Sequence, residues 1–231
     1  RFSLGGSMTV RLIFPLLLGF IGAAILVSLG VWQMQRLEWK QGILAEIDTQ
    51  ISGPAIALPM APDPEADRYA PVELIGTIGR PEIPVLVSVK RVGPGCRLIV
   101  PFETEGRRIL LDQGFIPLEA KDTVRPPGKV TLRGNLHWPD EIDSYTPEND
   151  LGANIWFSRD VPTLADALDT EPLLVIAATQ TDPSVTPLPV DSSAIPNDHL
   201  NYAVTWFSLA VVWLGMTAVL ASRIRRATTK G

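Results

Sequence analysis

The stretch LIFPLLLGFIGAAILVSLGVW, residues 12–32, decides the architecture of this 231-residue chain. It carries no charged residue, and as an α-helix it would extend about 31 Å at a rise of about 1.5 Å per residue. The hydrocarbon core of a bilayer is about 30 Å thick, so this stretch predicts a membrane-spanning helix. Pro15 falls in the first turn, where a missing N–H is tolerated. Trp32 stands at the far end, as interfacial aromatic residues do.

A second uncharged stretch, YAVTWFSLAVVWLGMTAVLA at residues 202–221, predicts a second spanning helix. Gly19, Gly22 and Ala23 in the first span are small enough to allow close packing against another helix. The first span is longer than the apolar region of a typical secretory signal, and no A-x-A-like cleavage site follows it. The sequence therefore predicts an uncleaved anchor rather than a signal peptide.

Basic residues near the spans set the expected orientation, because Lys and Arg accumulate on the cytoplasmic side. The tail at 222–231 contains four basic residues and the tail at 1–11 contains two. If RFSLGGS before Met8 is an artificial extension, Arg1 does not count. We expect both tails in the cytoplasm and residues 33–201 in the periplasm of a bacterium. The absence of a long Arg- and Ser-rich transit segment favours a bacterial inner membrane over a mitochondrial one.

Charge is divided sharply along the chain. All 25 acidic residues lie within residues 36–201, whereas six of the 20 basic residues lie outside that region. An acidic central domain lacks the basic face that nucleic-acid binding requires, so no nucleic-acid partner is expected. Cys96 is the only cysteine, and the four methionines are scattered. A disulfide, a thiolate cluster and a copper site with paired soft ligands are therefore not expected.

The region between the spans has the pattern of a strand-rich domain. Apolar residues at helical spacing predict that the first helix continues to Ser52, before Gly53-Pro54. Glu105-Gly106 predicts a tight hairpin, and residues 161–168 predict a helix. Short apolar runs bounded by Gly, Pro or Asp predict strands, at residues 72–78, 85–90, 98–104, 108–112, 130–136, 155–158 and 173–178. We expect an α+β membrane protein, with two transmembrane helices flanking a mainly antiparallel, barrel- or sandwich-like extracytoplasmic domain.

The sequence contains no Ser/His/Asp set, nucleotide-binding glycine loop or HExxH motif, so a catalyst is not expected. The acidic run at Asp140, Glu141 and Asp143 is expected to be a solvated loop. Only two histidines are present. His137, next to Trp138 at a strand end, is expected to be a surface or packing residue.

His199 is the stronger candidate, because an ionisable residue at a membrane boundary indicates function. At about 100° per residue, Tyr202, Trp206 and Trp213 lie within roughly 60° of His199 on one helix face. Two interpretations remain open from the residues alone. His199 is either a ligand, as histidine commonly is to haem iron, or an interfacial histidine within an ordinary aromatic belt.

Several stretches of the chain resemble the Surfeit locus protein one family of cytochrome c oxidase assembly factors, in its bacterial form. They are LGVWQMQRLEWK at 29–40, YAPVELIGTIG at 69–79, GPGCRLIVPFET at 93–104, GFIP at 114–117 and PNDHLNYAVTWFSLA at 196–210. The first and last stretches are the most specific, and both border a predicted span. Gln113 is a difference, because the family usually has Arg at that position. The role of that Arg is not carried over to this chain.

The resemblance implies a protein that helps to place haem a into oxidase subunit one. It implies His199 as an axial ligand of the haem iron, with the ring buried between the two membrane helices. Arg36 is expected to pair with a haem propionate. The expected cofactor-binding residues are His199, Tyr202, Trp206, Trp32, Gln33 and Arg36.

The expected partners are subunit one of cytochrome c oxidase, haem A synthase and membrane lipid. An alternative is a cofactor-free scaffold that stabilises an oxidase assembly intermediate. A first-helix face without polar or aromatic residues opposite His199 would favour that alternative. A haem-modifying enzyme is disfavoured because the spans contain no second histidine or acid. Whether haem is held stably or only passed on stays open.

Overall fold

The computed structural model describes residues 6–193 and 195–229, with the side chains of residues 12–193 and 195–227. The chain divides into two compact units. The helical unit consists of Arg1–Ala45 and Ser193–Gly231, and the barrel unit consists of Glu46–Ser192. Each unit is held together by its own side-chain packing.

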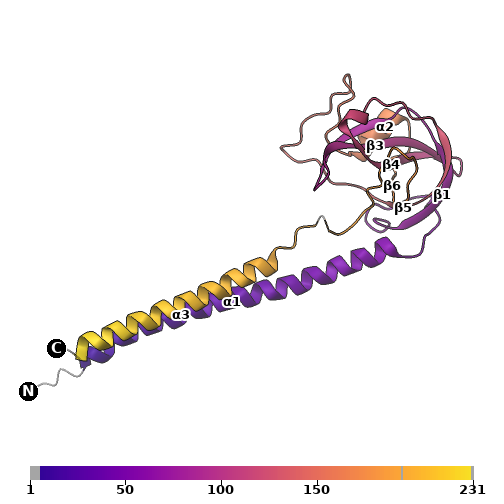
Figure 1. The fold of residues 1–231 in the computed structure, drawn as a ribbon. Helices are drawn as coiled ribbons and strands as arrows, with labels where there is room; N and C mark the ends of the chain where they lie inside the picture. Colours follow the sequence, from indigo (N-terminus) through magenta and orange to yellow (C-terminus); the bar gives the residue numbers. More distant parts are fainter. Residues whose placement is uncertain (1–5, 194, 230–231) are drawn as a thin grey trace, which may run out of the picture. The chain divides into compact units, whose positions relative to one another are not determined.

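The helical unit is an antiparallel pair of long helices. Helix α1 runs over Gly6–Ser52 and α3 over His199–Thr229, so the expected continuation of the first helix to Ser52 is confirmed. Figure 1 shows α1 (indigo) and α3 (yellow) side by side. They run in opposite directions, because Gln33 of α1 meets the first residue of α3 whereas Gly19 meets Trp213.

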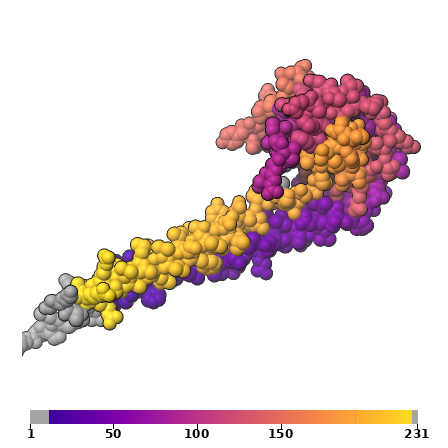
Figure 2. Space-filling model, viewed as in Figure 1, coloured from indigo at the N-terminus to yellow at the C-terminus, as the bar shows by residue number. Residues whose placement is uncertain are grey.

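The seam between the helices follows a heptad pattern. Covered positions recur at alternating steps of four and three residues, which is the spacing of a left-handed helix pair. On α1 they include Leu12, Leu16, Gly19, Ala23, Leu26, Gly30 and Gln33, and on α3 His199, Ala203, Trp206, Ala210, Trp213 and Thr217. A Cβ atom added to Gly19 or Gly22 would collide with Thr217 or Trp213. The expected packing role of these glycines is confirmed, and Figure 2 shows the two helices in direct contact.

The outer faces of both helices are apolar and uncovered. Phe14 is 70% exposed, Phe20 69% and Val211 70%. Only 11% of the most apolar window of each helix is buried, whereas the core helix of a soluble domain is mostly buried. By length and composition the helices are candidate membrane spans, at Leu12–Ser52 and His199–Ala227.

The barrel unit is built on a closed ring of strands. Its strands are β1 (Pro71–Ile78), β2 (Ile83–Val89), β3 (Gly93–Thr104), β4 (Arg107–Pro117), β5 (Gly128–Leu136) and β6 (Leu174–Ala177). The sheet order is β1-β5-β6-β4-β3-β2, and an additional β1–β3 pairing closes the ring, with β2 attached outside it to β3. Without β2, the ring order is first, second, third, fifth, fourth, as in the OB-fold barrel. Only β4 and β6 pair in parallel among these strands, so the expected mainly antiparallel barrel is confirmed.

Strand β3 makes closure possible by changing partners along its length. Its first half pairs with β2 and its end pairs with β1. The register against β4 shifts between Arg97 and Ile99, and such a bulge bends and twists a strand. The predicted hairpin to β4 is confirmed: Glu105 has φ 51° and Gly106 has φ 76°, the two positive values that a type I′ turn requires.

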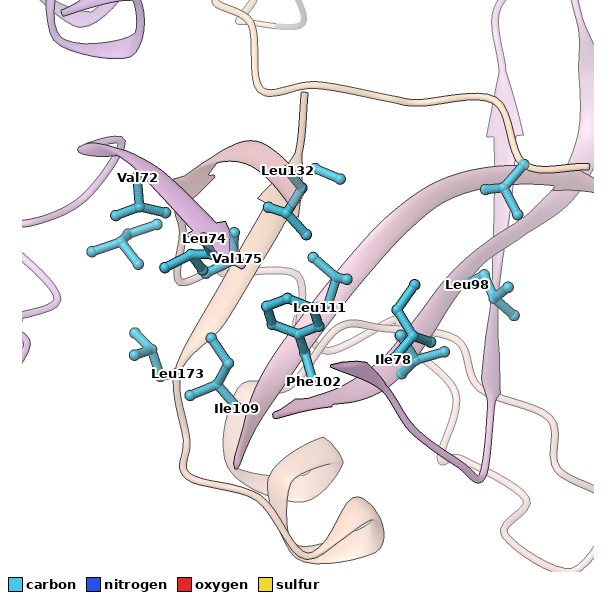
Figure 3. Packing of buried hydrophobic residues seen from close by; sticks show 14 of the residues in the cluster. Val72, Leu74, Ile78, Leu98, Phe102, Ile109, Leu111, Leu132, Leu173 and Val175 are labelled. Atoms are coloured by element: carbon cyan, nitrogen blue, oxygen red, sulfur yellow. The ribbon is translucent and has the colours of Figure 1, made fainter. Parts of the chain in front are cut away.

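Apolar side chains pack on both faces of the barrel wall, inside and outside. Alternate residues of the ring strands fill the interior (Figure 3), among them Leu74, Leu98, Phe102, Leu111 and Val175. Helix α2, Val161–Leu168, covers the outside together with Trp156 and residues of β2, β4 and β6. Strand β6 lies between both layers, and all four of its residues are buried. The helix predicted at 161–168 is therefore confirmed with its bounds.

Three strand predictions need correction. Residues 155–158 form isolated bridges to Val85 and Asp150 instead of a strand, because Trp156 turns into the outer apolar layer. Strand β3 begins at Gly93, earlier than expected, since its glycine-rich start pairs with β2. Strand β4 continues to Pro117 because Gly114, at φ 121°, carries the strand through the irregular stretch.

Candidate functional site

The site is built where α3 begins. His199 is the first residue of α3, and its Nδ1 lies 2.8 Å from Oε1 of Gln33 on α1. Gln33 is only 9% exposed, whereas the imidazole is half-buried. The contact occupies the last layer of the seam, so the same helix pairing that buries Gln33 fixes its distance to the imidazole.

A histidine oriented in this way could act as the single protein ligand of a metal that a macrocycle holds. Metal-binding histidines use one ring nitrogen and hydrogen-bond the other to an oxygen, which sets ring orientation. With Nδ1 engaged by Gln33, Nε2 is the nitrogen left to bind metal. Among the described residues, no group of three or more His, Cys, Asp or Glu could hold a bare metal ion. Haem iron needs only one or two protein ligands, so the donor set fits haem.

The other residues expected at the site differ in their exposure and in their contacts. Tyr202 is 56% exposed and Trp32 54% exposed, so both face outward. Trp206 is half-buried on the seam. Arg36 lies 3.9 Å above the ring of Trp39, a partner that sequence reasoning missed although its i, i+3 spacing indicated it. The structure therefore brings His199 and Gln33 together and leaves Tyr202 and Trp32 on the surface.

The seam between α1 and α3 is closed in the layers that follow His199. Ala203 is 1% exposed, Ala210 3% and Ala23 6%, because small residues draw the two helices together. Trp213, which shares the face of His199, donates from Nε1 to the carbonyl of Gly19 at 3.0 Å. Small residues thus close the seam in the layers beyond His199, and a haem position between the helices stays a prediction.

An apolar cavity of about 240 Å³ lies between the helices at their other end. Its walls are Phe14, Pro15, Leu18, Gly19, Trp213, Met216, Thr217 and Leu220. More than ten residues of α3 separate these positions from His199. The cavity is therefore distinct from the histidine site.

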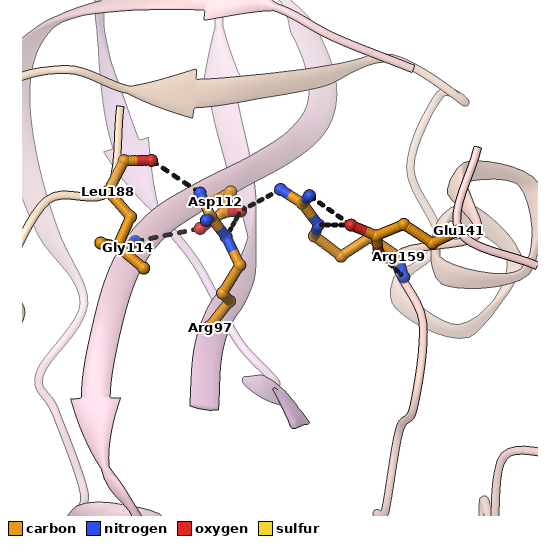
Figure 4. Close-up of polar contacts among 6 residues, drawn as sticks. All are labelled: Arg97, Asp112, Gly114, Glu141, Arg159 and Leu188. Atoms are coloured by element: carbon orange, nitrogen blue, oxygen red, sulfur yellow. Dashed lines mark hydrogen bonds and ion pairs between the residues drawn. The ribbon is translucent and has the colours of Figure 1, made fainter. Parts of the chain in front are cut away.

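The barrel unit carries a separate buried charge cluster (Figure 4). Asp112 on β4 is fully buried and is 2.6 Å from Nε of Arg97 and 3.2 Å from Nη1 of Arg159. Gly114 donates its N–H to the other carboxylate oxygen at 3.0 Å. Each oxygen of Asp112 is therefore engaged. The sequence signal is an acid within the apolar run RILLDQG, which matches no motif of a known site.

Arg159 connects this cluster to the acidic loop. Its guanidinium binds the carboxylate of Glu141, and its backbone N–H donates to the same group at 2.8 Å. Burial opposes ionisation of Glu141, but the hydrogen bonds and charge of Arg159 hold its pKa below the ordinary value. Asp140 and Asp143 are exposed as expected. Glu141 is not merely solvated, because it anchors the loop to Arg159.

His137 is a packing residue rather than a surface residue. Its ring stacks on Tyr69, with centroids 5.3 Å apart, and its Nδ1 is buried without a hydrogen-bond partner in the described part of the chain. Burial lowers the pKa of His137 to about 4, and the charges of Arg159 and Arg68 act in the same direction. The imidazole is therefore neutral in the folded protein at neutral pH.

This lowered pKa predicts loss of stability as pH falls. The unfolded chain binds a proton at His137 below about pH 6.5, whereas the folded chain does so only near pH 4. Unfolding should therefore become easier by up to about 2 kcal/mol between pH 7.5 and pH 5. His137→Gln should remove this part of the slope. Urea unfolding at both pH values checks it, and equal slopes in the wild type and the variant would contradict it.

Comparison with known proteins identifies the family. The model of the SURF1 family matches residues 20–211. The chain belongs to the SURF1 family. It is 26% identical to human Surfeit locus protein 1 over 208 residues, covering 79% of this chain and 69% of the human protein. It is 27% identical to Surfeit locus protein 1 of Xenopus tropicalis, with 79% and 67% covered. The SURF1-like protein of Monosiga brevicollis is 28% identical, with 84% and 82% covered.

The SURF1 match includes the histidine site and the whole barrel unit. His199, Gln33 and Asp112 all lie within residues 20–211. All eight residues that line the apolar cavity, among them Phe14 and Leu220, lie outside that range. The histidine site therefore has the stronger connection to the family.

Proposed function

We propose that this SURF1-family protein is an assembly factor for haem-a-containing cytochrome c oxidase. It binds haem a through His199 and assists insertion into subunit one, and it catalyses no reaction itself. The observation that carries the proposal is the imidazole of His199, held by Gln33 at the start of a candidate membrane span. The family resemblance supports the role in oxidase assembly, and the His199–Gln33 pair supports the binding of haem.

The chain's own residues provide binding and orientation. Haem a, when bound, would supply an iron that could bind an imidazole nitrogen. His199 offers Nε2, and Gln33 orients the ring through Nδ1. Arg36 remains positively charged while it lies over Trp39, so it is available to a propionate. Tyr202 and Trp32 offer exposed aromatic surface for an apolar ring.

A cofactor-free scaffold is the second candidate. It would be favoured if α1 presented only apolar residues opposite His199. Gln33 instead places a buried amide there, and a buried polar residue in a membrane helix pair indicates function. The deciding experiment is the absorption spectrum of the protein purified from cells that make haem a. A protein free of haem a after such purification would leave the scaffold ahead.

The proposed partners follow from this role. Subunit one of cytochrome c oxidase is the recipient of the haem, and haem A synthase is the proposed donor. Membrane lipid surrounds the apolar outer faces of α1 and α3. Cross-linking from the region near His199 should capture one of the two proteins when haem transfer is in progress.

The proposed location is the bacterial inner membrane, with residues 33–201 in the periplasm. The basic residues after the second span, Arg223, Arg225 and Arg226, support a cytoplasmic end. A cytoplasmic reporter fused after Gly231 should be active, and alkaline phosphatase fused there should be inactive. A phosphatase fused within the exposed loop at Tyr145 should be active. The opposite pattern would refute this orientation.

A further inference from the structure

We infer that Gln33 is a positioning residue that fixes the tautomer of His199, with the proton on Nδ1 and the lone pair on Nε2. The role of this tautomer in haem binding rests on the proposed function. The tautomer itself is a property of the protein without haem. The two can therefore be tested separately.

The geometry assigns the proton. Oε1 of Gln33 is a carbonyl oxygen and can only accept a hydrogen bond. It lies 2.8 Å from Nδ1 of His199 in the amide orientation of the structure, and in that orientation Nδ1 is the donor. A neutral imidazole carries one proton, which leaves Nε2 unprotonated. An imidazole in this form is ready to bind a metal without first losing a proton.

The surroundings hold Gln33 in place. It lies on the heptad seam and is 9% exposed, so its amide has little access to water. One turn earlier, Gly30 lies directly against Phe207 of α3, leaving no space for a Cβ atom. A buried amide without a partner is costly, and His199 is the partner that the helix pairing supplies. The hydrogen bond and the helix register therefore reinforce each other.

The chemical nature of Gln33 also suits a protein that must release its cofactor. Many metal-binding histidines donate to a carboxylate, which makes the imidazole a stronger ligand. Gln33 accepts the same hydrogen bond without a negative charge. It should orient His199 while polarising the ring less than a carboxylate would. A metal bound to His199 would therefore be held less strongly than one bound to a histidine that donates to Asp or Glu.

The first test uses the full-length protein without haem, in detergent at pH 8. The chain has only two histidines, so labelling histidine with ¹⁵N in the His137→Gln background leaves the signal of His199. The wild-type shifts should show a protonated Nδ1 and a bare Nε2. Gln33→Leu should move them toward the Nε2–H form, whereas Gln35→Leu, at an exposed position of the same helix, should not. A protonated Nε2 when Gln33 is present would overturn the assignment.

The second test measures bound haem a in the same variants. Loss of a hydrogen-bonding partner to a metal ligand typically lowers affinity about 10- to 100-fold, and we expect this for Gln33→Leu. Gln33→Glu, which keeps the size and adds charge, should lower the midpoint potential of the haem. Gln35→Leu should change neither. Unchanged affinity and potential in both Gln33 variants would refute the positioning role. A wild type that binds no haem would refute the proposed function, while the nitrogen shifts would still decide the tautomer.

Discussion

Replacing His199 with Ala is expected to remove haem a from the purified protein while the protein still reaches the membrane in normal amounts. The substitution deletes the imidazole and leaves α3 intact, because Ala is a good helix former. The apolar seam from Ala203 to Thr217 does not depend on the imidazole. Loss of the axial ligand should therefore be separable from loss of the helix pair. The measurement is haem a per protein, from the absorption spectrum of preparations purified side by side.

His137→Ala is the matched control, because it removes the only other histidine. That residue stacks on Tyr69 in the barrel unit and has a buried, unpartnered Nδ1. Its haem content and spectrum should equal those of the wild type. Equal haem content and identical spectra in the wild type and the His199 variant would remove the ligand assignment and favour the scaffold.

Replacing Asp112 with Asn is expected to destabilise the barrel unit by about 3–5 kcal/mol, which is typical when one partner of a buried ion pair is removed. The Asp112 carboxylate is fully buried between two arginines. The amide keeps the size but not the charge, so Arg97 would lose its counter-charge and Arg159 would keep only that of Glu141. Whichever way the amide turns, its NH2 would also face a donor, either the guanidinium groups or the N–H of Gly114.

The measurement is urea unfolding followed by the fluorescence of Trp138 and Trp156, both in the barrel unit. Asp140→Asn, at an exposed position of the acidic loop, is the control and should change the free energy of unfolding by less than about 0.5 kcal/mol. A loss of less than about 1 kcal/mol in the Asp112 variant would mean that the cluster is not needed for the fold.

Much of the architecture could be predicted from local sequence patterns. The two uncharged stretches contain the candidate spans, because a helix exposed to lipid needs apolar residues on every side. The helix at 161–168 was predicted with its bounds, and in the structure Asp160 caps it by accepting the N–H of Thr163. The hairpin at Glu105-Gly106 followed from turn chemistry alone. These features depend on residues close together in the chain.

The candidate site was only half predictable. His199 stands out in the sequence because it borders an apolar span. The contact with Gln33 does not, because 166 residues separate the two and only the antiparallel register of α1 and α3 brings them together. The same register closes the seam at Ala203 and Ala210. This closure could not be predicted from the sequence, because it also depends on the register of the two helices.

The sequence by itself determined the spans, most strands and the histidine at the boundary, because each is set by local hydrophobicity or turn preference. Tertiary structure decided the closure of β1 onto β3, the parallel pairing of β4 with β6, and the charges around Asp112. Each of these three features brings together segments that are distant in the sequence, and packing of the whole barrel decides which segments meet. No local pattern encodes such a choice, since many registers of short apolar strands satisfy the same alternation.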